Sequence, residues 1–184
     1  VFYNTAGWHL WFQDDDLNYK FSKNHKIRNN LAILARQDRN QEVDPLEPDP
    51  FPNGTELGDA ACFYIRSFTD NEFVNNHAAS SQCCGFYVDT REPWGEFEWD
   101  RRIPHEFKTG KFKDNVAHSC AVHGFYLGGA TEFKPGVPKR GSNPPPYVSD
   151  AFFDHFTTYK NNGLGFHCRN AGTCIWYNVA AADN

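Results

Sequence analysis

Short runs of aromatic and β-branched residues, separated by turn residues, dominate the chain after residue 60. Such runs predict strands, because bulky and β-branched side chains suit a pleated surface and glycine, asparagine and proline interrupt it. Strands are expected at residues 61–68, 85–89, 96–99, 122–127, 151–159, 164–169 and 173–179. Residues 160–163 and 170–172 end in glycine and predict hairpin loops between the last three of these strands.

The best helix candidate lies near the N-terminus, at residues 26–39. Its apolar residues at helical spacing are Ile27, Leu31, Leu34 and Ala35. They would form one apolar stripe, and the arginines that follow would lie in the last turn, where the helix dipole favours cations. We expect this helix to cover one face of a sheet. The alternative is a pro-segment that is cleaved near the arginines.

Prolines and acidic residues divide the chain into three parts. Residues 41–53 carry Pro45, Pro48, Pro50 and Pro52 and cannot hold a helix, because proline removes a donor and restricts the residue before it. This connector separates a cysteine-free arm with the helix, residues 1–40, from a body at residues 54–184. No internal repeat is apparent. The expected fold is mainly β, a sandwich or barrel stabilised by disulfides, with one N-terminal helix.

Composition and charge narrow the classes of partner. Of the 184 residues, 40% are hydrophobic and 22% are charged, which is typical of a folded domain rather than a disordered chain. The formal net charge is −5, and no run of lysine and arginine exceeds two residues. A basic stripe for nucleic acid, a polybasic membrane patch and a membrane span are therefore not expected. The predicted partner is a protein or glycan on a cell surface or in the extracellular space.

The cysteines indicate an oxidising compartment. They are even in number, show no zinc-binding spacing, and are all expected to form disulfides: Cys62, Cys83, Cys84, Cys120, Cys168 and Cys174. Neighbouring strand residues face opposite sides, so Cys83 and Cys84 should tie different parts of the body. Cys168 and Cys174 either bridge across a hairpin or reach toward the earlier cysteines.

Two further features fit a secreted, extracellular protein. The sequon Asn53-Gly54-Thr55 lies in a polar turn and predicts glycosylation at Asn53. No methionine occurs, even at position 1, which indicates a processed N-terminus from which a signal peptide has been removed.

Metal ligands are sought among histidines and clustered carboxylates. His118 and His123 are five residues apart, a spacing that suits neither a helix face nor a strand face. Asp14, Asp15 and Asp16 could ligate calcium, but they lack the alternating spacing of a calcium loop and equally suit a helix cap. We expect neither a metal nor a cofactor.

Three short motifs carry candidate chemistry. They are Ile103-Pro104-His105-Glu106-Phe107, Glu132-Phe133 and Leu164-Gly165-Phe166-His167. Together they resemble the fungal guanyl-specific ribonucleases and ribotoxins. The resemblance implies Glu132 as general base, His167 as general acid and His105 as electrostatic partner in the attack of a 2′-hydroxyl on phosphorus. The family's arginine has no match here, which removes the main stabiliser of developing phosphate charge.

Aromatic residues suggest a second kind of site. Trp94, Phe97 and Trp99 cluster in one segment, and Phe97 and Trp99 would lie on one face of a strand whose other face carries Glu96 and Glu98. The aromatic face forms either core or an exposed platform for sugars or proteins. The sequence thus predicts a secreted, cysteine-stabilised recognition protein of toxin, virulence-effector or lectin type that acts by surface binding. The alternative is a secreted guanyl-ribonuclease-like hydrolase with impaired catalysis, so whether the protein is an enzyme stays open.

Overall fold

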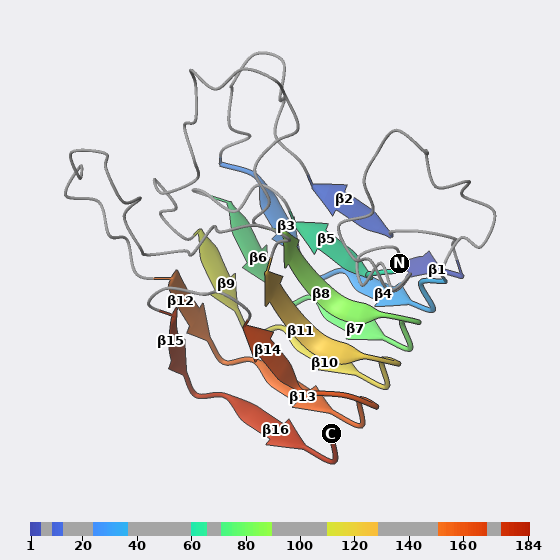
Figure 1. Ribbon diagram of the computed structural model, residues 1–184. Helices are drawn as coiled ribbons and strands as arrows, with labels where there is room; N and C mark the ends of the chain where they lie inside the picture. Colours follow the sequence, from blue (N-terminus) through green and yellow to red (C-terminus); the bar gives the residue numbers. More distant parts are fainter. Residues whose placement is uncertain are drawn as a thin grey trace, which may run out of the picture.

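A computed structural model describes residues 1–4, 9–12, 24–36, 60–65, 71–89, 110–128, 151–168 and 174–184. In these residues the chain winds through three parallel β-sheets and forms a parallel β-helix (Figure 1). No helix occurs in these ranges, so none of the described residues forms a helix that could cross a membrane.

Each sheet takes every third strand of the chain. Sheet I contains β1 (Phe2–Tyr3), β4 (Leu31–Ile33), β7 (His77–Ala79), β10 (Val116–His118), β13 (Thr157–Tyr159) and β16 (Ala180–Ala182). Sheet II contains β2 (Leu10–Phe12), β5 (Phe63–Ile65), β8 (Cys84–Asp89), β11 (His123–Gly128) and β14 (Phe166–Cys168). Sheet III contains β3 (Lys26–Arg28), β6 (Glu72–Val74), β9 (Lys111–Lys113), β12 (Ala151–Asp154) and β15 (Cys174–Tyr177). Figure 1 shows the strands of sheet I following one another from β4 down to β16.

One coil of the β-helix passes from sheet III to sheet I and then to sheet II. Equivalent residues of successive coils pair in register, as Ile27, Phe73, Phe112 and Phe153 do in sheet III. The chain therefore contains an internal repeat, contrary to expectation. Its period varies, since Asn30 and Asn76 are separated by 46 residues but Asn76 and Asn115 by 39.

The corner between sheets III and I is made by two residues in each coil. The first of them adopts a left-handed conformation, with φ between 48° and 58°, and is Asn29, Asn75, Asp114, His155 or Asn178. Asparagine and aspartate reach this region more readily than most residues, which explains why they recur here. The second is an asparagine in three successive coils. Asn30, Asn76 and Asn115 form a ladder of hydrogen bonds inside the corner.

The core is filled by aromatic rings from sheets II and III and by small residues from sheet I. The Phe112 ring packs against Phe86, Phe125, Phe153 and Phe156 at centroid distances of 5.4 to 5.6 Å. At Gly85, sheets I and II come so close that the facing residues must be small. A Cβ added to Gly85 would lie 2.7 Å from the Ala117 Cβ.

The prediction of a helix at residues 26–39 is wrong. Residues 26–33 form β3 and β4, which are separated by the left-handed residue Asn29. Each strand is only three residues long and buries its central residue, Ile27 or Ala32, while Leu31 and Ile33 lie on the outer side half-buried. The apolar residues of two such strands, joined by a corner, happen to have the spacing of one face of a helix. The strands of residues 1–36 pair with later strands in all three sheets.

The mainly β composition is confirmed, but the sandwich or barrel and the hairpins are not. Every strand pair described is parallel. The strands on either side of residues 160–163 and of residues 170–172 belong to different sheets. The connector at residues 41–53 and the strand at residues 96–99 lie outside the described residues.

Candidate functional site

Of the three residues expected to be catalytic, only His167 lies in the described part of the chain. It is the middle residue of β14, the last strand of sheet II, and pairs with Tyr126 of β11. His105 and Glu132 lie outside the described residues, so their convergence with His167 stays a prediction.

A second histidine contacts His167. The Nε2 atom of His123 lies 3.0 Å from the Nδ1 atom of His167, and the backbone N–H of Leu164 donates to His123 Nδ1 at 3.1 Å. Because Nδ1 of His123 accepts that bond, the neutral ring carries its proton on Nε2 and donates it to His167. Burial, together with the neighbouring His167, lowers the pKa of His123 to about 4. His123 is therefore held as a neutral imidazole, which donates to His167 Nδ1 and orients the His167 ring.

The histidine pair ends an aromatic column on the outer face of sheet II. Tyr64, Tyr87, Tyr126 and His167 occupy equivalent positions in successive coils. The tyrosine rings stack at centroid distances of 5.4 and 5.1 Å, and the His167 ring meets Tyr126 edge-on at 5.0 Å. The three tyrosines are buried. A repeat visible in the sequence could have revealed this column, since Gly85-Phe86-Tyr87 and Gly124-Phe125-Tyr126 recur as Gly165-Phe166-His167.

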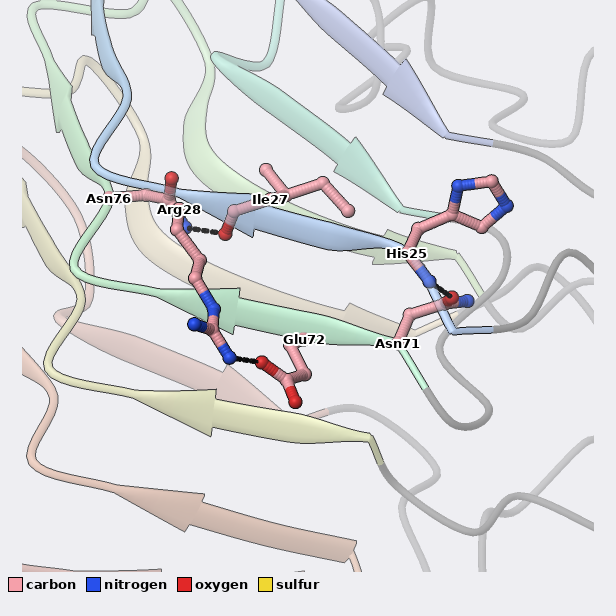
Figure 2. Close-up of polar contacts among 6 residues, drawn as sticks. All are labelled: His25, Ile27, Arg28, Asn71, Glu72 and Asn76. Carbon is pink, nitrogen blue, oxygen red and sulfur yellow. Dashed lines mark hydrogen bonds and ion pairs between the residues drawn. The ribbon is translucent and has the colours of Figure 1, made fainter.

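Sheet III carries a different set of side chains on its outer face. One row across the strands is Lys26, Glu72, Lys111 and Phe152, and the second is Arg28, Val74, Lys113, Asp154 and Tyr177. Arg28 pairs with Glu72, and Figure 2 shows these side chains reaching toward each other across β3 and β6. The Lys113 ammonium lies 3.3 Å from the Asp154 carboxylate.

The outer face of sheet III is more basic than the protein as a whole. Four of its residues are cationic and two are acidic, whereas the whole chain has a formal net charge of −5. Lys26 and Lys111 are exposed and have no ion pair among the described residues. At the end of the face, Phe152 and Tyr177 are 45% and 51% exposed, and their rings lie nearly parallel at a centroid distance of 6.4 Å. The outer face of sheet III therefore has cations on β3 and β9 and exposed aromatic rings on β12 and β15.

The described residues contain no group of three or more histidine, cysteine, aspartate or glutamate side chains arranged to hold a metal ion. Disulfides are not shown either. Cys62 and Cys120 are buried thiols that contact backbone carbonyl oxygens, and burial raises the pKa of each to about 12. The side chain of Cys174 and the sequon asparagine Asn53 lie outside the described part. The bridging of the six cysteines and the glycosylation therefore stay predictions.

Comparison with known proteins identifies the β-helix. A family model described as the CEMIP β-helix matches residues 1–125. No curated protein and no solved structure matches the chain. The matched region contains β1 to β10 and the start of β11, so it covers strands of all three sheets. Since it also covers more than half of the chain, the protein belongs to the CEMIP β-helix family.

Proposed function

We propose that the protein is a secreted recognition module that binds an anionic glycan along the outer face of sheet III. The proposal is supported by the concentration of cations and exposed aromatic rings on one face of an acidic protein. A basic surface on a molecule of net negative charge attracts anionic ligands selectively, because the rest of the surface repels them.

The spacing of the face suits an extended polymer. Neighbouring strands lie about 4.8 Å apart, so equivalent side chains form rows along the axis of the β-helix. A chain of acidic sugars lying along these rows would meet Lys26 and Arg28 on β3, then Lys111 and Lys113 on β9. Lys26 and Lys111 offer the strongest contacts to such a ligand, because neither is already paired with a carboxylate in the described residues.

The aromatic pair supplies the apolar part of the contact. Sugar rings present apolar C–H faces, and these faces pack on exposed aromatic rings. Phe152 and Tyr177 lie on neighbouring strands with their rings nearly parallel, so one sugar unit could cover both. Their exposure is the observation that carries the proposal, since the interior rings of the same strands are buried or half-buried.

The experiment compares a uronic-acid polysaccharide with a neutral glucan of similar length by isothermal titration calorimetry. We expect the protein to bind the acidic polymer and not the neutral one, and added salt to weaken binding because exposed charges are screened. Lys111→Glu and Phe152→Ala should each weaken binding at least several-fold. Lys160→Glu makes the same charge change at the corner after sheet I and serves as the matched control. Equal effects of the two glutamate variants, or equal binding of both polymers, would contradict the proposal.

A hydrolase acting on RNA is the second candidate, with Glu132 as base, His167 as acid and His105 as electrostatic partner. The observation that favours it is the hydrogen bond from His123, which fixes the orientation of the His167 ring as a general acid requires. Digestion of RNA by the purified protein, compared with His167→Gln, tests it. Cleavage that is lost in the variant would support the hydrolase, and no cleavage by the unmodified protein would refute it.

A further inference from the structure

Two adjacent cysteines meet inside the protein at the start of β8. Cys83 ends the corner between sheets I and II, and Cys84 is the first residue of the strand. Their sulfur atoms lie 3.4 Å apart, in hydrogen-bond contact. The alternation of side chains along a strand does not separate them, because Cys83 precedes the strand. Both belong to one buried cluster beside Tyr87 and Tyr126.

The backbone of this dipeptide is held from both sides. The Cys83 carbonyl accepts hydrogen bonds from the N–H groups of Val122 and His123 in the following coil, at 3.0 and 3.3 Å. The Cys84 carbonyl accepts the N–H of Cys62 in the preceding coil at 3.1 Å. The Cys83 N–H donates to the Ser81 hydroxyl oxygen at 3.1 Å. These contacts fix the two side chains toward the same cluster, so the contact between the sulfur atoms is set by the fold.

We propose that Cys83 and Cys84, instead of tying different parts of the body as the sequence predicts, are an oxidation site at which the two sulfur atoms form a disulfide between adjacent residues, while Cys62 and Cys120 stay reduced. Bond formation brings the sulfurs from 3.4 Å to about 2.05 Å. The two thiols lose two electrons and two protons and form one S–S bond. A small-molecule disulfide such as oxidised glutathione accepts the electrons and protons and is reduced to two thiols.

Such a bridge is strained and easily reduced. Adjacent Cα atoms are about 3.8 Å apart, below the usual range of about 4.4–6.8 Å for bridged cysteines. Burial raises the pKa of the Cys84 thiol, and the reactive thiolate is therefore scarce in the folded protein. Oxidation should accordingly be slow in the native state and faster when the cluster opens, during folding or under mild denaturation.

Peptide mapping of the full chain tests the proposal directly. Trypsin releases residues 67–91, which contain Cys83, Cys84 and no other cysteine, whereas Cys62 and Cys120 fall in separate peptides. The protein is incubated with oxidised glutathione in native buffer and in urea just below its unfolding transition, alkylated without reduction and digested. We expect residues 67–91 to lose two hydrogen atoms and both alkyl groups, and to regain both groups after reduction with dithiothreitol. The loss should be faster in urea.

Two variants test whether the bridge forms between Cys83 and Cys84 alone. Cys84→Ser should leave Cys83 carrying a single glutathione, while Cys62→Ser should leave the bridge in residues 67–91 unchanged. Linkage of residues 67–91 to the peptide of Cys62 or of Cys120 would overturn the proposal. So would complete alkylation of both cysteines after incubation in urea.

Discussion

The asparagine ladder between sheets III and I makes Asn76 the most informative position for a stability measurement. Its side-chain amide donates to the Ile27 carbonyl at 2.9 Å and to Asn115 Oδ1 at 3.1 Å (Figure 2 shows the first of these bonds). Its Oδ1 atom accepts the backbone and side-chain N–H groups of Asn30 at 3.1 and 3.0 Å. Asn76→Ala removes all four hydrogen bonds and leaves the strand pairing in place.

The cost follows from the groups that are left without partners. Asn115 Oδ1 still accepts the Asn76 backbone N–H at 2.9 Å, so its loss is small. The Ile27 carbonyl and the Asn30 backbone N–H lose the partners described above. Each such group costs about 1–3 kcal/mol, which predicts a loss of about 2–6 kcal/mol from a total stability of about 5–15 kcal/mol. For a chain of this size the melting temperature should fall by about 2–4 °C for each kcal/mol.

Two variants make the argument refutable. Asn30→Ala removes the first side chain of the ladder, which donates to Asn76 Oδ1 and to the carbonyl of the exposed Arg28. The free energy of unfolding should fall by less than about 1.5 kcal/mol, because water can replace these hydrogen bonds. Asn76→Asp puts a carboxylate opposite two acceptors and should cost more than Asn76→Ala. The free energy of unfolding is measured by urea titration with tyrosine and tryptophan fluorescence. Equal losses of free energy of unfolding in Asn76→Ala and Asn30→Ala would show that the buried Asn76 side chain contributes no more than the Asn30 side chain.

Three further changes probe the core and the histidine pair. The unfolded chain takes up a proton on His123 near pH 6.5, but the folded chain takes it up only near pH 4. Stability should therefore fall as the pH drops from about 6.5 to about 4. In His123→Phe, the urea midpoint should depend less on pH over this range. Phe112→Ala should cost about 3–5 kcal/mol in urea titration, because the buried ring leaves a cavity among four aromatic neighbours. Gly124→Ala places a Cβ 2.1 Å from the Thr158 hydroxyl and should lower the melting temperature, whereas adding Thr158→Ala should restore part of it.

The β character of the chain was predictable because long strands carry the clearest signal. Two strands of sheet II, β8 and β11, are six residues long and rich in aromatic residues, and their predicted ranges agree with the structure to within one residue. The three-residue strands of sheets III and I were missed or merged. The expected strand at 151–159 is two strands, β12 and β13, with a left-handed residue, His155, between them. A strand that buries one side chain shows no alternation to detect.

The parallel arrangement was hidden by the unequal length of the coils. One corner contains Asn30, Asn76 and Asn115, yet these residues are separated by 46 and 39 positions, so the sequence has no fixed repeat length. The recurring Gly-Phe-Tyr motifs were the better signal. Aligning Gly85 with Gly124 and Gly165 places His167 in the tyrosine column, which the isolated motifs do not.

Single strands of the β-helix carry both core residues and outer-face residues. In β9, Phe112 points into the aromatic core while Lys111 and Lys113 lie on the outer face of sheet III. The core requires a large apolar residue at the central position of each sheet III strand, but it places no demand on the flanking positions, which alternate to the other side. Lys111→Glu should therefore change binding of an acidic polymer without changing the free energy of unfolding by more than about 0.5 kcal/mol, as expected for a surface change. Phe112→Ala should lower the midpoint and leave the affinity of the remaining folded protein intact. If Lys111→Glu destabilised the protein as much as Phe112→Ala, the outer face of sheet III would be part of the folding core rather than a surface for ligands.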